Sequence, residues 1–397
     1  MHATRVRGPL PVLLTLFIAV CGWTQSKDQS ATFQITATHN AVSSTSGMQP
    51  PLRVAWSVNL GATVSYPLIA GGRVFVIAGD YTANSVNMYA LDVRNGTVLW
   101  GPVAIARGYY WWAAAAYDNG KIFVVPNTVS GLVSGAMFAY DAASGKQLWS
   151  VALPGQYFFT SPPTALNGVV YTGGAGSGGT VYAVRETDGK VLWTGSVENG
   201  DGSSPAVSSN GVYVSYACPQ SYRFNPATGA LVWHYSGPCE GGGGLTPVLY
   251  QGGLYVRDSF FVPHNGTILN ANTGAVLGYF DSVYPPVFSD GTAFYTQTNS
   301  LTAMDVETGE VYWTAAPATG DSYTISPVIV NGVVYVGTAL GNVLGYKTSS
   351  GKKVVSTYVG YPVIGSEYNV SNPPVGMGAA QGVLVVPAGT HVVALKH

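Results

Sequence analysis

One short pattern recurs along the whole chain and limits what the chain can fold into. It consists of an apolar strand, a tight turn that ends in glycine, and a second apolar strand that ends in tryptophan. The clearest copies are ALDVRNGTVLW at 90–100, AYDAASGKQLW at 139–149, AVRETDGKVLW ending at Trp193, RFNPATGALVW ending at Trp233, and AMDVETGEVYW at 303–313. Two weaker copies, around Gly274 and Gly351, keep the turn and lose the tryptophan. Each copy predicts a β-hairpin.

The second strand of the hairpin recurs at a regular interval. Its positions lie roughly 43 residues apart, within the interval of about 40 to 45 that four-stranded propeller blades show. Successive side chains of a strand point to opposite sides, so Val98 and Trp100 face one way and Leu99 the other. Both sides are apolar, which predicts that each sheet packs between two neighbours. The tryptophans at these positions then wedge the blades together, and they are Trp56, Trp100, Trp149, Trp193, Trp233 and Trp313, with Gly278 and Val355 in the two degenerate places.

Two-residue turns give an independent count of the blades. They suit type I′ hairpins because Gly, Asn and Asp tolerate positive φ. There are eight: Gly71-Gly72, Asn119-Gly120, Asn167-Gly168, Asn210-Gly211, Gly252-Gly253, Asp290-Gly291, Asn331-Gly332 and Gln381-Gly382.

The two ends of the chain complete each other. The last unit begins at Gly376 and lacks a fourth strand, whereas LRVAWSVNL, with Trp56, stands alone before the first repeat. Pairing them closes the ring and removes exposed strand edges. Residues 52–397 therefore predict an all-β fold, an eight-bladed β-propeller of four-stranded antiparallel blades whose last blade is closed by the N-terminal strand.

The residues before the repeats predict export. Arg5 and Arg7 precede an apolar run from Leu10 to Val20, which is shorter than the roughly 20 residues of a bilayer span. Residues 1–25 therefore predict a signal peptide, and we expect the mature protein in the periplasm, at the cell surface or outside the cell. Residues 26–51 are rich in Ser, Thr, Gln and Asn without apolar periodicity, which predicts a flexible linker.

The three cysteines of the chain are consistent with this predicted export. IAVC, ending at Cys21, resembles a bacterial lipobox, which implies lipidation of Cys21; ordinary cleavage to a secreted protein is the alternative. Cys218 and Cys239 are close in sequence, and in an oxidising compartment they predict a disulfide.

Charge and motifs exclude several classes of function. Charged residues make up 9% of the chain, the net charge is −1, and no Lys/Arg run occurs, so we expect no nucleic-acid partner. A membrane is expected to be contacted only through a lipid anchor. His234 and His264 lack partners at metal-ligand spacing, and no Gly-x-Ser-x-Gly turn occurs, so the sequence predicts neither a metal site nor a catalytic constellation.

The repeat Ala-x-Asp-x-x-Thr/Ser-Gly-x-x-x-Trp resembles that of the pyrroloquinoline-quinone (PQQ) dehydrogenases and their non-enzymatic relatives. The resemblance covers the chain after Pro51 and implies the fold more strongly than an activity. It implies either a quinoprotein dehydrogenase that holds PQQ and calcium over the channel, or a cofactor-free scaffold like the lipoprotein of the outer-membrane β-barrel assembly machinery. The chain lacks the Cys-Cys pair and the Cys-x-x-Cys-His haem site of many such enzymes.

One rim of the predicted ring carries short uniform turns, and the other carries loops of variable length. Binding residues concentrate in loops on a rigid scaffold, so we expect a ligand at the variable rim. The aromatic run in RGYYWWAAAA is a candidate stacking platform, with packing between blades as the alternative. The acidic residues of equivalent loops are candidates to line the mouth, with solvated charges as the alternative. The candidate ligand-binding residues are Tyr109, Tyr110, Trp111, Trp112, Asp201, Glu240, Asp321 and Glu367.

The sequence thus predicts an exported binding scaffold for a protein, a glycan or a small molecule, with no cofactor. A PQQ-dependent sugar or alcohol dehydrogenase is the first alternative, and an outer-membrane assembly lipoprotein is the second.

Overall fold

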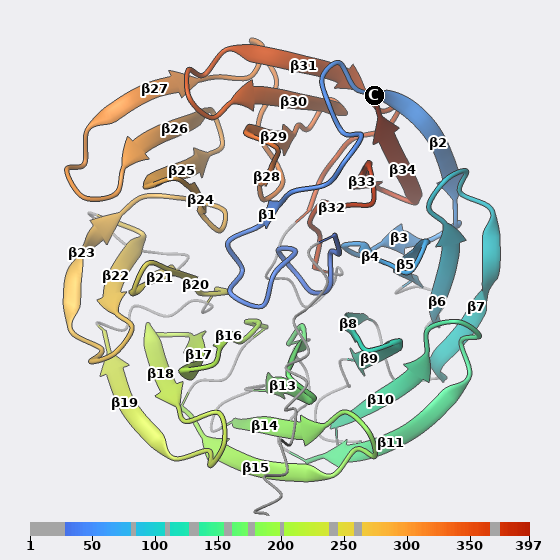
Figure 1. Cartoon of the computed structure of the whole chain (residues 1–397), viewed down its shortest axis with the longest axis vertical. Coiled ribbons are helices and arrows are strands. Elements are labelled where there is room, and N and C mark those ends of the chain that lie inside the picture. Colours follow the sequence, from blue (N-terminus) through green and yellow to red (C-terminus); the bar gives the residue numbers. More distant parts are fainter. Residues whose placement is uncertain are drawn as a thin grey trace, which may run out of the picture.

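The computed structural model describes residues 28–80, 85–107, 112–126, 135–154, 161–173, 179–198, 202–237, 245–257, 264–365 and 374–397. These residues form eight antiparallel sheets arranged as a ring (Figure 1), with the first strand of each sheet nearest the axis. This confirms the predicted all-β, eight-bladed propeller. Among the described residues, no helix is long and apolar enough to cross a membrane.

The blades follow one another in chain order. The strands of each blade are named in order from the innermost to the outermost. Blade 1 is β4 (Leu68–Ala70), β5 (Arg73–Asp80), β6 (Ser85–Asp92) and β7 (Val98–Arg107), with β3 (Thr63–Val64) also paired to β5; blade 2 is β8 (Ala113–Asp118), β9 (Lys121–Pro126), β10 (Gly135–Asp141) and β11 (Gln147–Leu153); blade 3 is β12 (Thr164–Leu166), β13 (Val169–Gly173), β14 (Thr180–Arg185) and β15 (Val191–Ser196); blade 4 is β16 (Ala206–Ser208), β17 (Gly211–Tyr216), β18 (Gln220–Phe224) and β19 (Leu231–Ser236).

The second half of the ring repeats this order. Blade 5 is β20 (Val248–Tyr250), β21 (Gly253–Arg257), β22 (Gly266–Asn270) and β23 (Val276–Phe280); blade 6 is β24 (Val287–Ser289), β25 (Thr292–Gln297), β26 (Ser300–Asp305) and β27 (Val311–Ala315); blade 7 is β28 (Val328–Val330), β29 (Val333–Gly337), β30 (Asn342–Lys347) and β31 (Lys353–Tyr358); blade 8 is β32 (Gly378–Ala380), β33 (Val383–Ala388), β34 (His391–Lys396) and β2 (Arg53–Asn59).

The ring is closed by the two ends of the propeller, as predicted. Strand β2 pairs antiparallel with β34, from Arg53 opposite Lys396 to Asn59 opposite His391. Blade 8 therefore takes three strands from the C-terminus and its outer strand from the N-terminus, which leaves no unpaired gap between the first and last blades.

The turns between the first and second strands follow the prediction with two corrections. Seven of them have positive φ at both central residues, as type I′ requires. In blade 5 this pair is Gln251-Gly252, one residue before the predicted pair, because Tyr250 pairs with Gly253. In blade 4 Ser208 pairs with Gly211, so the turn is Ser209-Asn210, and neither residue has positive φ.

A repeated contact of tryptophan joins neighbouring blades. In six junctions the indole Nε1 of the outer strand donates a hydrogen bond to a backbone carbonyl in the third-to-fourth-strand turn of the next blade. The pairs are Trp56 to Val93 (3.2 Å), Trp100 to Ala142 (3.1 Å), Trp149 to Glu186 (3.0 Å), Trp193 to Pro226 (2.8 Å), Trp233 to Ala271 (3.0 Å) and Trp313 to Thr348 (2.9 Å).

Each of these indoles also lies against the glycine of the same turn. A Cβ on Gly229 would stand 2.6 Å from the indole of Trp193, and the glycine has φ of +71°. Both the contact and the backbone conformation therefore require glycine there. This double requirement explains why the turn glycine and the tryptophan recur together in the sequence.

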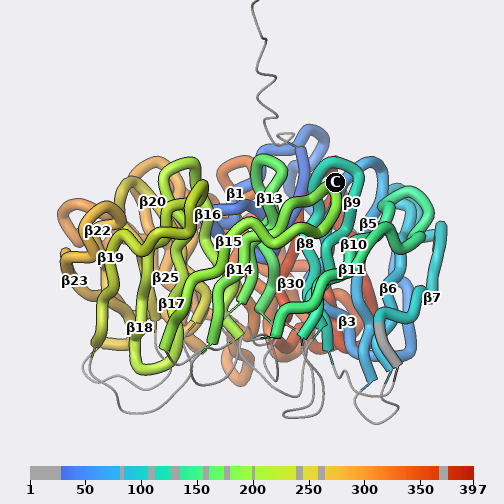
Figure 2. The backbone as a smooth tube through the Cα atoms, turned by 90° about the horizontal axis from the view of Figure 1, so that it is seen from below, coloured from blue at the N-terminus to red at the C-terminus, as the bar shows by residue number. Residues whose placement is uncertain are grey.

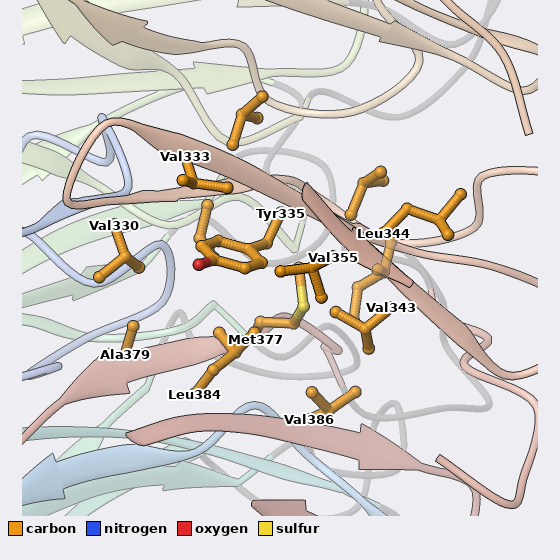
Figure 3. Close-up of a cluster of buried hydrophobic side chains, with 14 of the residues drawn as sticks. Val330, Val333, Tyr335, Val343, Leu344, Val355, Met377, Ala379, Leu384 and Val386 are labelled. Carbon is orange, nitrogen blue, oxygen red and sulfur yellow. The ribbon is translucent and has the colours of Figure 1, made fainter. Parts of the chain in front are cut away.

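The junction between blades 7 and 8 lacks a tryptophan and is filled in another way. Val355 stands in its place and is buried in the largest apolar cluster, with Tyr335, Val343 and Met377 (Figure 3). Thr357 of β31 donates a hydrogen bond to the carbonyl of Leu52, just before β2. The chain segment that leads into β2 thus completes this junction.

The junction between blades 2 and 3 holds a pair of carboxyl groups. Glu186 is buried and accepts a hydrogen bond from Asn119 Nδ2 at 3.2 Å. Burial, followed by the repulsion of Asp118, raises the pKa of Glu186 to about 8.

Residues 28–51 do not form the predicted flexible linker. They enter the ring between the short turns and fill its centre (Figures 1 and 2), and Phe33, His39 and Ala41 are fully buried there. We call residues 28–45 the plug. The prediction failed because composition shows only that this segment buries too little apolar surface by itself. It does not show that inner strands from many blades converge around it.

Backbone groups, hydroxyl groups and the carboxylate of Asp28 attach the plug to seven of the eight blades. Strand β1 (Val42–Ser43) pairs parallel with β28. The other hydrogen bonds join Ser30 to Ile69, Ala31 to Tyr117, Thr32 to Pro163, Ala37 to Val207, Thr38 to Leu249, and both Asp28 and Thr45 to the Gln381-Gly382 turn. A segment rich in Ser and Thr is suited to this position, because its neighbours are mainly backbone polar groups.

His39 is the polar centre of the plug. Its Nδ1 lies 3.1 Å from the carbonyl of Pro247, which can only accept, so Nδ1 carries the proton. Its Nε2 lies 3.3 Å from Thr164 Oγ1, which can donate to it, and 3.2 Å from Ser204 Oγ, whose hydrogen is donated to the carbonyl of Pro162. Burial lowers the pKa of His39 to about 4, so the ring is neutral at pH 7 and ties blades 3, 4 and 5 together.

We expect Trp193→Ala to lower the free energy of unfolding by about 3–5 kcal/mol, because it removes a buried indole and its hydrogen bond to Pro226. The neighbouring Leu192→Ala, at a side chain that is 43% exposed, should change it by about 0.5 kcal/mol. Urea unfolding followed by fluorescence measures both. Equal losses in the two variants would contradict a special role for the indole.

The raised pKa of Glu186 predicts that stability falls as the pH rises from the acidic range toward about 8. The folded state holds a proton that the unfolded state releases above about pH 4.5, so stability falls as pH rises from about 4.5 to about 8, by at most about 1.4 kcal/mol per pH unit. Glu186→Gln should flatten this part of the profile of melting temperature against pH. Glu310→Gln, at an exposed position, is the control and should leave the profile unchanged.

The lowered pKa of His39 predicts the opposite dependence at lower pH. The unfolded state binds a proton below about pH 6.5 that the folded state binds only near pH 4, so stability falls as pH drops across this interval. His39→Asn keeps a donor near the Pro247 carbonyl and should remove this dependence. The exposed His397→Asn is the control, and an unchanged profile in His39→Asn would refute the assignment.

Candidate functional site

The strand directions sort the connections into two rims. Connections from first to second and from third to fourth strands form the uniform rim. Connections from second to third strands and from one blade to the next form the variable rim, where the sequence analysis predicts a ligand. The described variable-rim connections include residues 60–67, 217–219, 281–286, 316–327 and 338–341.

The inner strands start at the variable rim with a shared local pattern. In six blades a proline immediately precedes the inner strand, where no ladder hydrogen bond needs its N–H. These are Pro67, Pro163, Pro205, Pro247, Pro286 and Pro327.

Hydroxyl groups beside these prolines join neighbouring blades at the mouth of the channel. Ser161 Oγ donates to the carbonyl of Ser203 at 2.7 Å, and Ser204 Oγ lies 2.8 Å from the carbonyl of Pro162. The Ser204 N–H donates to Thr246 Oγ1 at 3.2 Å. These hydrogen bonds thus hold blades 3, 4 and 5 together along one side of the mouth; we call this arc of hydroxyl groups the polar ring.

The tip of the plug reaches this level of the channel. Phe33 packs edge-on against Tyr66, with ring centroids 5.2 Å apart, and Tyr66 lies two residues before β4. Gln34 follows in a tight turn with φ of 58°, closed by the hydrogen bond from Ile35 N–H to the Thr32 carbonyl. Both amide atoms of Gln34 are buried and have no hydrogen-bond partner among the described residues. The plug therefore forms the floor of the mouth.

Arg257 is a cation at this rim that the sequence analysis missed. It ends β21 and is 2% exposed. Its Nη1 donates to the carbonyl of Val283 at 2.8 Å, and its Nη2 lies 3.4 Å from the carbonyl of Thr246. It thus holds two successive connections of the variable rim. An arginine at the end of a strand among apolar residues was the available signal, but nothing local shows that it is buried.

Most of the predicted ligand-binding residues lie outside the described part of the chain. These are Tyr109, Tyr110, Trp111, Asp201, Glu240 and Glu367, so their roles stay predictions. Trp112 is described and is 2% exposed, immediately before β8. It is therefore buried rather than at an open surface.

Asp321 lies on the variable rim, but its carboxylate is hydrogen-bonded to other residues of the protein. Oδ1 accepts from the N–H groups of Ser322 at 2.8 Å and Leu340 at 3.0 Å, and Oδ2 lies 3.4 Å from Asn342 Nδ2. Asp321 thus anchors the turn between β29 and β30.

The cysteine predictions fall mostly outside the described residues. Cys218 is buried just after β17, on the variable rim, with φ of 60°. Its predicted partner Cys239 and the predicted lipidation site Cys21 are not described, so the pairing and the anchor stay predictions.

The described residues supply only part of what PQQ with calcium needs. Arg257 offers a buried positive charge near the mouth. Within the described ranges, no group of three or more His, Cys, Asp or Glu side chains is placed to hold a metal ion. These residues alone do not fit a calcium site.

Comparisons with known proteins agree with this architecture. A family model described as "Outer membrane protein assembly factor BamB" matches residues 52–109, 88–236, 134–281 and 177–396. The chain is 25% identical over 323 residues to the tetrathionate hydrolase of Acidithiobacillus ferrooxidans, covering 68% of this chain and 61% of that protein. It is 26% identical to the quinohemoprotein alcohol dehydrogenase ADH-IIG of Pseudomonas putida, covering 68% of this chain and 35% of that enzyme.

Solved structures show the same fold at lower identity. A europium-containing methanol dehydrogenase superposes with a TM-score of 0.69 at 14% identity, covering 94% of this chain and 99% of that one. BamB from Moraxella catarrhalis superposes with a TM-score of 0.61 at 18% identity, covering 87% and 98%. The chain spans less than two thirds of the hydrolase and of the alcohol dehydrogenase, so their activities do not transfer with the fold. The repeats, the eight closed blades and the family match together show that the chain belongs to the PQQ-repeat β-propeller family, which includes quinoprotein alcohol dehydrogenases and BamB.

Proposed function

We propose that this protein is an exported binding scaffold that takes a protein, a glycan or a small molecule at its variable rim. The observation that carries the proposal is the plug. Residues 28–45 fill the inside of the ring from the uniform rim and bond to seven blades, so a ligand in the channel has to come from the other side.

The variable rim has the features of a binding surface. Its connections differ in length and sequence from blade to blade, whereas the blades beneath them are held rigidly by the repeated indole contacts. Beneath these connections, the polar ring of blades 3 to 5, Phe33 and Gln34 form a buried, partly apolar base. Polar side chains of the connections held over such a base would suit selective recognition.

Residues 1–25 support export, because a basic start and a short apolar run are features of a signal peptide. The matches to BamB support the related possibility of an assembly lipoprotein anchored through Cys21.

A PQQ-dependent sugar or alcohol dehydrogenase is the second candidate. It is supported by the similarity to quinoprotein alcohol dehydrogenases and by Arg257, a buried cation suited to an anionic quinone near the mouth. PQQ would supply the redox chemistry when bound, and Arg257 and the loops of the mouth would hold and orient it.

The first test is a titration of the purified mature protein with PQQ in calcium, with dye reduction by aldoses and alcohols as the second readout. We expect no saturable binding at micromolar PQQ and no turnover. Saturable binding with substrate-dependent turnover would replace the scaffold by the enzyme. Binding without turnover would make the protein a quinone-binding scaffold.

A glycan array and a peptide array then test the scaffold directly. We expect the double variant Tyr110→Ala, Trp111→Ala on the variable rim to lose at least about tenfold in affinity for any ligand found, equivalent to about 1.4 kcal/mol. Lys190→Ala, in a third-to-fourth-strand turn of the uniform rim, is the matched control and should bind normally. Loss of binding in the control alone would place the ligand on the opposite rim.

A further inference from the structure

The junction between blades 5 and 6 lacks the indole that six other junctions share. Gly278 of β23 occupies the tryptophan position, because it pairs with Ile268 as Trp313 pairs with Ala303 and Trp193 with Ala183. A Cβ on Gly278 would meet only Ile268 Cδ1, at 4.0 Å. Gly278 does not have positive φ, so a side chain is sterically acceptable there.

The receiving side of this junction is nevertheless built like the others. The turn of blade 6 has the same glycine, Gly309, with φ of +73°. In the six tryptophan junctions a Cβ on the equivalent glycine would meet the indole within 2.9 Å, whereas nothing lies within 4 Å of one on Gly309. Gly309 is exposed, whereas Gly96 and Gly145 are buried beneath Trp56 and Trp100. We call this uncovered place, bounded by Gly278, Val306 and Gly309, the notch.

The blades hold together here without an indole. Phe280 of β23 stacks on Tyr295 of β25, with ring centroids 5.3 Å apart, and Tyr250 stacks on Phe288 at 4.4 Å. These pairs bury the inner part of the junction in one apolar cluster. The outer part is left open, unlike the junction of blades 7 and 8, where the segment before β2 completes the packing.

Apolar side chains line the notch and remain partly exposed. Ile268, which pairs with Gly278 and faces the same side, and Val306 are only partly buried. Val306 also occupies the turn position whose carbonyl accepts the indole hydrogen bond in other junctions, for example at Val93 and Ala271. The notch thus offers an apolar base, an uncovered turn glycine and a carbonyl acceptor in the arrangement that six indoles occupy in this same molecule.

We propose that the notch is an interaction site for another protein, which inserts a tryptophan side chain there. The indole would lie on Gly309, contact Ile268, and donate its Nε1 hydrogen to the carbonyl of Val306. A large, rigid aromatic side chain with one donor is also the kind of residue that dominates protein–protein interfaces. This site lies at the outer edge of the uniform rim, because Val306 and Gly309 belong to a third-to-fourth-strand turn, and it is independent of the variable rim.

The test uses N-acetyltryptophanamide as the probe and saturation-transfer NMR as the readout. We expect a saturable signal that weakens severalfold when the indole nitrogen is methylated, since methylation removes the donor. Gly278→Trp fills the notch from within and should abolish the signal while raising the melting temperature. The matched control is Val276→Trp, two residues away and on the opposite side of β23, where Val276 pairs with Leu269 and is 42% exposed; it should keep the signal.

Other results would overturn the proposal. An undiminished signal in folded Gly278→Trp, or equal binding of the methylated probe, would show that the probe does not use the notch. If Gly278→Trp does not fold, Ile268→Arg takes its place and should reduce the signal at least fivefold; no reduction would refute the site. A wild-type dimer that Gly278→Trp converts to a monomer in sedimentation analysis would identify a second copy of this chain as the occupant.

Discussion

The contact between an indole and a turn glycine is the interaction on which the ring depends. Neighbouring blades meet face to face, joined along the chain by single connections and without strand pairing between their sheets. Each junction therefore needs a side chain that reaches across and fixes the angle. In this ring the indole does so in three ways, by apolar contact, by lying on a glycine with positive φ, and by donating to a fixed carbonyl. Six repetitions of that geometry make the ring rigid enough to present irregular connections at one rim.

The two junctions without tryptophan show how much freedom this arrangement leaves. At blades 7 and 8 the segment before β2 and Val355 take over the packing, which links closure of the ring to its N-terminal strand. At blades 5 and 6 aromatic stacking moves inward to Phe280 and Tyr295. In both places the degenerate repeat marks a local change of structure, and the second leaves an exposed site whose shape the other junctions define.

The plug gives the two rims different roles. A propeller with an open channel would offer its axis from either side, whereas residues 28–45 occupy the axis of this ring and are held by the inner strands of seven blades. This packing requires His39 to be neutral. A charged imidazole would be buried away from water with only neutral hydroxyls and carbonyls as neighbours. The relatives of this chain include enzymes and a scaffold protein, and the filled channel is the feature that favours the scaffold.

The sequence by itself determined the blades, their number and the closure of the ring, because hairpin turns, strand alternation and the tryptophan–glycine pair are local patterns that repeat. It also marked the variable rim as the place to look for a site, through loop length alone. Only the tertiary structure decided that residues 28–51 are ordered, that Arg257 is buried, and that Asp321 is used internally. These outcomes depend on groups far apart in the chain: Asp28 reaches Gln381, and His39 reaches Thr164, Ser204 and Pro247. A polar segment has no periodicity that reveals such partners, since they exist only once the eight sheets have closed around the axis.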